Sequence, residues 1–440
     1  IVGIQGLKTG RITLVSFALI LSILTIFRQV IFFAGLDVPS PQTHLGETEW
    51  ELVSLASVVC IVWVIFVMAG YVLSAGSAQV FAHLLPRGPQ TPHGGAAHGT
   101  RFVVLVSATF AIGGTLYLIA QSGGVAQFAY AQKIGKAFKG LFVIKEATTL
   151  TSLLAIYGLL SNVVKSKTGK ARIGWRGTGY LLIIVASMAA NYSWGNRYNI
   201  ALTLIVLGLS WHYYVAPLRF LRTLILAVIV MAFLQFLREI RGGLLADVRG
   251  ASFQGLDNKW LEISASLHFV EFDALLLVLR DTGDLFDYRQ GADFYNGLLS
   301  WVPRSIYADK ESFNIGPWFR RVYQPTKING WPVTVMGAWY VNFAWIGIPI
   351  GGLISGFIMR VIDAAYRDVK SNPWHASIGT GIAIFVIEGG VNTGFPQSIF
   401  LLFVPLALAS MWMKNVSSRN LSRQNKVRKP LSSKIHVGEV

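Results

Sequence analysis

The stretch that decides the fold class is Leu52–Leu73, LVSLASVVCIVWVIFVMAGYVL, which contains no charged residue. An α-helix of about 20 such residues crosses the roughly 30 Å hydrocarbon core of a bilayer. Similar runs recur along the 440-residue chain, in which 53% of the residues are hydrophobic and 13% are charged. The mean hydropathy of +0.53 is high for a soluble domain. The sequence therefore predicts an all-α polytopic membrane protein.

About ten segments are predicted to cross the membrane. They are Ile12–Phe33, Leu52–Leu73, Phe102–Ile119, Leu141–Leu160, Tyr180–Trp194, Tyr198–Val215, Leu218–Leu237, Tyr340–Ile362, Ile378–Gly394 and Ser398–Met413. They divide the chain into four parts, which are helices over residues 1–237, a long loop over 238–339, helices over 340–413 and a basic tail over 414–440. The one cysteine, Cys60, lies inside an apolar run, so a disulfide framework is not expected.

The distribution of positive charge predicts how these helices are oriented. Cytoplasmic loops of membrane proteins are enriched in lysine and arginine, and both the loop around 165–176 and the tail over 414–440 are strongly basic. With ten spans both face the cytoplasm, and the long loop 238–339 faces outward. The lysines of 133–139 depart from this trend, because they fall on the outer side. The net charge of +17 thus indicates topology and not nucleic-acid binding.

The long loop is predicted to carry its own helical structure. Residues 260–279, WLEISASLHFVEFDALLLVL, repeat apolar side chains at helical spacing. The acids Glu262, Glu271 and Asp273 make this a poor spanning helix, so an amphipathic helix at the membrane interface is expected. Aromatic residues are dense after it, which is typical of a segment that contacts lipid headgroups or sugars.

A set of cations on the outer side is the main candidate site. Its members lie in the polar segment Trp301–Asn342 or at the outer ends of other helices, and they are Arg197, Arg238, Arg241, Arg304, Lys310, Arg320 and Arg321. Arginine presents a planar fork of donors that matches phosphate oxygens, and it stays protonated. The alternative is that these side chains hold headgroups or pair with acids such as Glu239. Because the set runs against the positive-inside trend, phosphate binding is favoured.

Further candidates are single polar residues. His268 titrates near neutrality and could remove a proton from a hydroxyl, although a lone histidine is more often a surface residue. Glu388 lies inside a predicted span and could contact a sugar, accept a proton or pair with an arginine. Tyr340 and Asn342 lie at the outer start of a helix and are polar enough to meet a substrate. No HExxH, CxxC or DxD motif appears, so no metal site is predicted.

Three motifs resemble the O-antigen polymerase family of oligosaccharide repeat-unit polymerases. The first is Gly-Asn-Arg at 195–197, at the start of a mid-chain helix. The second is VPRSIYADK at 302–310, in the long outer loop. The third is GAWYVNFAWIG at 337–347, where a glycine-rich helix begins. The resemblance is firmest over about 238–360.

The resemblance implies a reaction at the outer face of the bacterial cytoplasmic membrane. A metal-independent, inverting glycosyltransferase with a GT-C-like fold and no cofactor would move a glycan from undecaprenyl pyrophosphate onto a new lipid-linked repeat unit. The implied partners are lipid-linked oligosaccharide, membrane lipid and a chain-length regulator. Arg197, Arg238, Arg241, Arg304 and Lys310 would contact the pyrophosphates, and Tyr340 and Asn342 would shape the sugar site. His268, Glu239, Glu271 or Asp273 could serve as the base.

Three other functions remain open. An O-antigen ligase would use the same chemistry to move the finished glycan to another acceptor. A flippase or transporter of lipid-linked oligosaccharide would require charges along the middle of the helix bundle, whereas most ionisable residues cluster in the loops. A structural scaffold of a polysaccharide assembly would not require the arginines at all.

Overall fold

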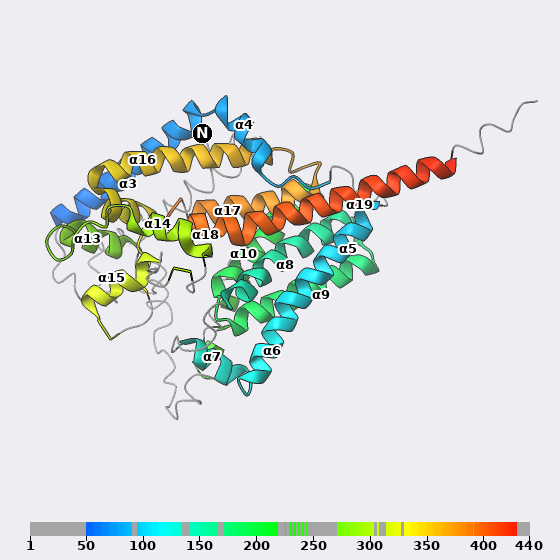
Figure 1. Ribbon diagram of the computed structural model, residues 1–440, viewed down its shortest axis with the longest axis horizontal. Helices are drawn as coiled ribbons and strands as arrows, with labels where there is room; N and C mark the ends of the chain where they lie inside the picture. The colour runs from blue at the N-terminus through cyan, green and yellow to red at the C-terminus, as the bar shows by residue number, and fades with distance from the viewer. Residues whose placement is uncertain are drawn as a thin grey trace, which may run out of the picture.

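The computed structural model describes residues 50–89, 95–133, 141–165, 171–218, 271–302, 306–307, 314–326, 330–389 and 391–428, with scattered positions between 225 and 243. In these ranges the structure is mostly α-helical (Figure 1), and the strands found there are β1 (Val163–Lys165) and β2 (Ala171–Ile173), which pair as an antiparallel hairpin. Among the described residues, the helices long and apolar enough to cross a membrane are Trp50–Leu73, His98–Gln121, Val143–Ser161, Val335–Ala365 and Phe395–Val416. The predicted all-α class is confirmed, and the count of ten spans stays a prediction.

The predicted spans within the described ranges coincide with helices. The long elements are α3 (Trp50–Leu73), α5 (Gly95–Ala108), α6 (Gly114–Gln121), α8 (Phe142–Ser161), α9 (Trp175–Ser193), α10 (Arg197–Ser210), α16 (Val335–Ala365), α17 (Thr380–Gly389) and α19 (Val404–Arg428). The shorter ones are α4 (Ser77–Phe81), η2 (Ala82–Leu84), η3 (Thr109–Gly113), α7 (Val125–Lys133), η4 (Trp211–Val215), α13 (Glu271–Asp281), α14 (Ala292–Leu298), η5 (Leu299–Trp301), α15 (Ile315–Tyr323), η6 (His375–Gly379), α18 (Phe395–Ser398) and η7 (Ile399–Phe403). Span Ile12–Phe33 lies outside the described residues, and Leu218–Leu237 lies largely outside them.

The helices α3 and α16 lie side by side and run in the same direction (Figure 1). Their backbones approach closely because glycines form the contact. A Cβ built on Gly352 would lie 2.8 Å from the Cβ of Phe66, and one on Gly356 would lie 2.0 Å from the carbonyl oxygen of Val67. The partner numbers rise together along both helices, so the packing is parallel. Small residues at such contacts are typical of helix pairs in membranes.

Gly356→Ala is expected to destabilise the protein by about 1–3 kcal/mol, because overpacking a close contact forces the backbones apart. The measurement is the thermal midpoint of unfolding in detergent. Gly208→Ala in α10 is the matched control, because a Cβ there meets nothing within 4 Å. Alanine is the better helix former, so Gly208→Ala is expected to keep or slightly raise the midpoint. Equal midpoints for the two variants would contradict the glycine contact between α3 and α16.

The remaining contacts give the bundle two distinct ends. Helices α8 and α9 are antiparallel, since Thr148 bonds Asn191 at 2.8 Å while Gly158 lies against the ring of Tyr180. We call the end that carries β1, β2 and residues 85–89 the hairpin end. We call the opposite end, which carries α13–α15 and the start of α16, the loop end. Figure 1 shows α13, α14 and α15 grouped together, while α19 extends beyond the bundle on the other side.

The direction of the helices follows from their contacts at these ends. Asn199, near the start of α10, donates to Thr149 at 2.6 Å, and Ser210 at its end donates to the carbonyl of Ala376 at 2.6 Å. Helix α10 therefore runs from the loop end to the hairpin end, and α16 runs the same way. The chain therefore returns to the loop end between the end of α10 and the start of α16, and the seventh span stays a prediction.

Helix α13 differs from the interfacial amphipathic helix predicted over 260–279. Its residues 272–279 are all buried, at most 8% exposed, and it packs against α3 and α16. The reason lies in the sequence FDALLLVL, which is apolar on almost every side, and a helix that is hydrophobic all round is enclosed by protein. Asp273, a candidate base, is 0% exposed. Residues 260–270 lie outside the described part of the chain.

Candidate functional site

The candidate site begins where α16 is broken, immediately after Asn342. Phe343 (φ −137°, ψ 16°) and Ala344 (φ 53°, ψ −151°) leave helical geometry, and a positive φ is costly for a residue other than glycine. The break leaves carbonyls of the preceding turn open to other donors. The N–H of Arg289 donates to the carbonyl of Val341 at 2.9 Å. The break therefore anchors the segment before α14 to the start of α16.

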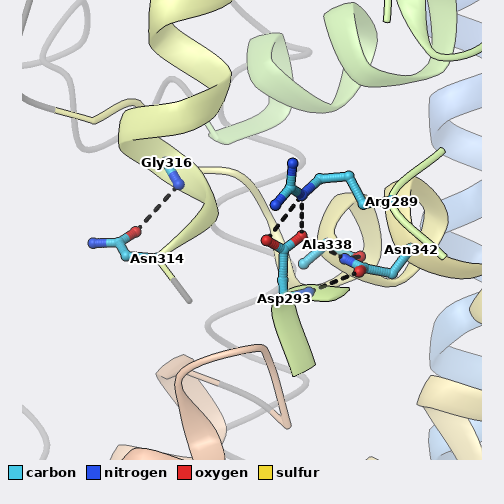
Figure 2. A network of polar contacts seen from close by, with 6 residues as sticks. All are labelled: Arg289, Asp293, Asn314, Gly316, Ala338 and Asn342. Atoms are coloured by element: carbon cyan, nitrogen blue, oxygen red, sulfur yellow. Dashed lines mark hydrogen bonds and ion pairs between the residues drawn. The ribbon is translucent and has the colours of Figure 1, made fainter. Parts of the chain in front are cut away.

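Asp293 is the centre of a buried polar network at this break (Figure 2). Its carboxylate is 0% exposed. It accepts from Nε of Arg289 at 2.9 and 2.8 Å and from Nδ2 of Asn342 at 3.0 Å. Nδ2 of Asn342 also donates to the carbonyl of Ala338 at 2.9 Å. A buried charge is tolerated when it is paired and hydrogen-bonded, so the network fixes the position of Arg289, whose guanidinium carbon lies 4.7 Å from the centre of the Trp318 ring.

Tyr340 and Asn342 were expected at the outer mouth of a helix, where a substrate could reach them. In the structure their exposed fractions are 4% and 2%, so both are buried. Tyr340 accepts a hydrogen bond from the hydroxyl of Tyr288 at 3.3 Å, and its ring packs edge-on against Trp345 at 4.9 Å. These contacts hold the loop before α14 to α16. A contact of either side chain with a sugar stays a prediction.

Arg320 on α15 carries a positive charge that the described neighbouring residues do not neutralise. Asn314 caps this helix by accepting from the N–H of Gly316 at 3.2 Å (Figure 2). Arg320 donates from Nε and Nη2 to Oε1 of Gln324 at 3.1 and 2.9 Å, and its guanidinium carbon lies 5.6 Å from the centre of the Trp331 ring. Both partners are neutral, and no carboxylate among the described residues pairs with it. Burial lowers the pKa of Arg320, but arginine remains protonated in proteins.

Aromatic rings surround this part of α15. They are Phe286, Trp318, Phe319, Tyr323 and Trp331, in contact at centroid distances of 5.2–6.5 Å. Tyr323 also donates to Asp281, and burial together with this hydrogen bond raises the pKa of Tyr323, so the phenol stays neutral. Arg321 is exposed and donates from Nε to the carbonyl of Pro317 at 3.2 Å. Phe319 and Trp331 are buried, whereas Trp318 and Tyr323 are partly exposed. The arrangement therefore offers a cation near two partly exposed aromatic rings, which suits a ligand with both phosphate and sugar.

A second cationic position lies at the turn between α9 and α10. Gly195 has φ +71°, and a Cβ there would lie 1.5 Å from Nη1 of Arg241. The guanidinium of Arg241 thus rests on the Gly195 backbone, next to Arg197 at the start of α10. Asn196 caps α10 by accepting from the N–H of Asn199 at 3.2 Å. The structure therefore places Arg241 against the turn that precedes Arg197, another of the predicted phosphate-binding arginines.

Three polar groups at this turn are buried without a hydrogen-bond partner among the described residues. They are Nε of Arg241 and the hydroxyls of Tyr192 and Tyr198. Buried polar groups are nearly always hydrogen-bonded in proteins. Tyr192 and Arg241 are close enough to interact electrostatically, so one anion with several acceptor oxygens would satisfy these two groups.

Comparison of the chain with protein-family models, with curated proteins and with solved structures finds no match. The family resemblance of the three motifs therefore stays a hypothesis about this chain.

Several predicted site residues are not placed by the structure. Arg238, His268, Arg304 and Lys310 lie outside the described residues. Glu271 begins α13 and Glu388 lies in α17, but their side chains also fall outside the described part. Glu239 lies in the partly described stretch two residues before Arg241. Within the described ranges, no group of three or more His, Cys, Asp or Glu residues could hold a metal ion.

Sequence reasoning missed Arg289 and Asp293. They are four residues apart in YRQGADF, a spacing that pairs side chains on a helix, but Gly291 has φ +82° and interrupts helical geometry before α14 begins. An arginine and an aspartate between aromatic residues, next to a glycine, were the signals available. Their partner Asn342 is far along the chain, so the network itself could not be read from the sequence.

Proposed function

We propose that this chain is a membrane glycosyltransferase that moves a glycan from a lipid pyrophosphate to a lipid-linked acceptor, as O-antigen polymerases do. The observation that carries the proposal is Arg320, a partly buried guanidinium held by the neutral side chains of Gln324 and Trp331 at the loop end. No carboxylate among the described residues pairs with this partly buried charge. A buried charge without a partner is costly, and a bound diphosphate would offset that cost. The partly exposed rings of Trp318 and Tyr323 on α15 provide surfaces for the attached sugars.

The chemistry follows from where charge develops. The acceptor hydroxyl attacks the anomeric carbon, the bond from that carbon to the pyrophosphate oxygen breaks, and the lipid pyrophosphate departs with the electron pair. Fixed guanidinium groups stabilise the charge that grows on this leaving group. The hydroxyl proton passes to a base. Asp273 is fully enclosed, so His268, Glu239 and Glu271 are the remaining candidates from the sequence.

The proposal includes an orientation in which the hairpin end faces the cytoplasm of a bacterial cell and the loop end faces outward. Supporting it, exposed cations such as Arg172, Arg176 and Lys414 lie at the hairpin end, as the positive-inside rule requires. Cysteines introduced at Asp287 and at Arg172, in a chain with Cys60 replaced by serine, test this. Impermeant thiol reagent added to intact cells is expected to label position 287 alone, and labelling of position 172 alone would contradict the orientation.

The function itself is tested by reconstitution. The purified chain in liposomes receives a lipid-linked repeat unit, with and without a chelator. A ladder of longer lipid-linked glycans in both samples is the expected result. A new glycosidic bond formed only on a different acceptor would identify a ligase, and passage of the substrate across the bilayer without any new bond would identify a transporter. A ladder lost on chelation would overturn the metal-independent mechanism.

Gly195→Ala tests the second cationic position. The added methyl group would occupy the place of the Arg241 guanidinium and displace it. We therefore expect the rate of glycan transfer to fall about a hundredfold, the usual effect of displacing a functional group by about 1 Å. The left-handed backbone adds a loss of stability of about 1 kcal/mol. Gly179→Ala in α9 is the control, because a Cβ there meets nothing within 4 Å. Unchanged transfer by a folded Gly195→Ala variant would remove Arg241 from the proposed site.

A further inference from the structure

Residues 85–89, Leu-Pro-Arg-Gly-Pro, are clamped at the hairpin end by side chains from three separate segments. The hydroxyl of Tyr366 and Nε1 of Trp374 both donate to the carbonyl of Pro86, at 3.1 and 2.9 Å. The hydroxyl of Ser410 on α19 donates to the carbonyl of Arg87. Side-chain donors on two successive carbonyls restrict the backbone of Arg87, so its side chain extends from a fixed backbone position.

The charge of Arg87 is not neutralised by the residues that the structure describes. Nη2 donates to the carbonyl of Ala82 at 3.1 Å. Nε is buried and has no hydrogen-bond partner among the described residues, and no described carboxylate forms an ion pair with this side chain. A buried donor without a partner costs stability unless a ligand or water satisfies it.

A second cation, Lys414, and a buried neutral histidine, His375, lie at the same place, and burial lowers the pKa of His375 to about 4. Lys414 lies one helical turn after Ser410 on α19, close enough to Arg87 for the two charges to repel. His375 follows Trp374 directly, is 8% exposed, and has a buried Nδ1 without a partner in the described part of the chain. Of the charged groups that act on His375, Arg87 and Arg367 are positive and Asp368 is negative. The positive charge here exceeds the negative charge.

Exposed apolar side chains lie near Arg87 and Lys414 in the chain. Val80, Phe81 and Leu84 on α4 and η2, and Met411 and Trp412 on α19, are all exposed. Exposed apolar side chains beside a cation match the two parts of a phospholipid, with acyl chains against the former and phosphate at the latter. A free phosphate ion would make no use of the apolar side chains.

We propose that Arg87 and Lys414 bind the phosphate of an anionic phospholipid, whose acyl chains lie along α4, η2 and α19. Arg87 supplies Nε and a guanidinium fork to the phosphate oxygens, and Lys414 supplies a second positive charge. The leaflet is the one at the hairpin end, which is the cytoplasmic leaflet in the orientation proposed above. The site is at the opposite end of the bundle from Arg320 and does not depend on glycan transfer.

The test is lipid binding to the full chain in detergent, followed by native mass spectrometry. The probes are a short-chain phosphatidylglycerol, its phosphatidylcholine counterpart and inorganic phosphate. We expect the anionic lipid to bind at least about tenfold more tightly than the zwitterionic one, and Arg87→Gln to remove about tenfold of that affinity. Arg172→Gln, which removes an exposed cation at the same end, is expected to bind like the wild type.

Each other outcome has a defined meaning. Equal binding by wild type and Arg87→Gln overturns the proposal, as does an equal loss in Arg172→Gln, which would indicate only unspecific attraction to positive charge. Binding of inorganic phosphate without binding of the anionic lipid would assign the site to a soluble phosphate and overturn the proposal that it binds a phospholipid. Where Arg87→Gln fails to fold, Lys414→Gln replaces it, since Lys414 is exposed. Lys414→Gln is expected to weaken binding of the anionic lipid several-fold. Unchanged binding would reject the site.

Discussion

Replacing Arg320 with alanine is expected to slow glycan transfer by about two to three orders of magnitude, the usual effect of removing one fixed group that stabilises a developing negative charge. The side chain is held by Gln324 and Trp331, so its loss leaves no buried carboxylate unpaired. The variant is therefore expected to fold, and the loss to appear in the rate. The measurement is the initial rate of product formation in liposomes at saturating lipid-linked substrate.

Arg320→Lys separates charge from geometry. Lysine keeps the positive charge but lacks the planar fork that bonds two phosphate oxygens at once, so a loss of roughly tenfold is expected. Arg172→Gln at the hairpin end serves as a charge-matched control and is expected to transfer at the wild-type rate. If Arg320→Ala transfers as fast as the wild type while remaining folded, Arg320 is not part of the site.

Replacing Asp293 with alanine is expected to destabilise the protein by about 3–5 kcal/mol. Removing one partner of a buried ion pair takes away the charge compensation that it gave the other, which is costly. Here Arg289 would lose both of its bonds to the carboxylate, and Asn342 would lose one of its acceptors. Of the contacts described above, the loop before α14 would then keep the N–H of Arg289 on Val341 and the hydroxyl of Tyr288 on Tyr340 as its bonds to α16. The measurement is the free energy of unfolding in mixed micelles.

Asp287→Ala is the matched control, since Asp287 lies in the same segment and is exposed. It is expected to change stability by less than about 0.5 kcal/mol. The double variant Arg289→Ala, Asp293→Ala should lose less than the two single losses added together, because the two residues form one network. Additive losses would show that Arg289 and Asp293 do not stabilise each other.

The class of the fold and the place of most helices could be predicted because they depend on local sequence. A run such as Leu52–Leu73 has no alternative to an apolar environment, and the described part of α3 matches it almost to the residue. The excess of cations in the loop around 165–176 likewise marks one end of the bundle. The prediction of an interfacial helix was wrong because it relied on the two acids Glu271 and Asp273, whereas the apolar run between 274 and 279 decides that the helix is buried.

The candidate site was predicted only in part. Arg320 and Arg321 were named from the sequence, but that Arg320 is held by neutral partners depends on Trp331, which reaches it through the fold of the loop. Arg241 and Arg197 were named separately, and the contact of Arg241 with the turn at Gly195 needs a backbone with positive φ. Asp293 was not named, because an aspartate in a loop gives no sign of being buried.

By itself, the sequence determined that the chain forms apolar helices, where most of them begin and end, and which loops carry positive charge. Hydrophobicity and charge act on each segment independently of its neighbours, so a linear reading is enough for these features. Only the tertiary structure decided that α3 lies along α16, that α13 is enclosed, and that Asn342 bonds Asp293. These contacts join residues far apart in the chain, and their free energy depends on close packing and hydrogen-bond geometry that exist only once the helices have come together.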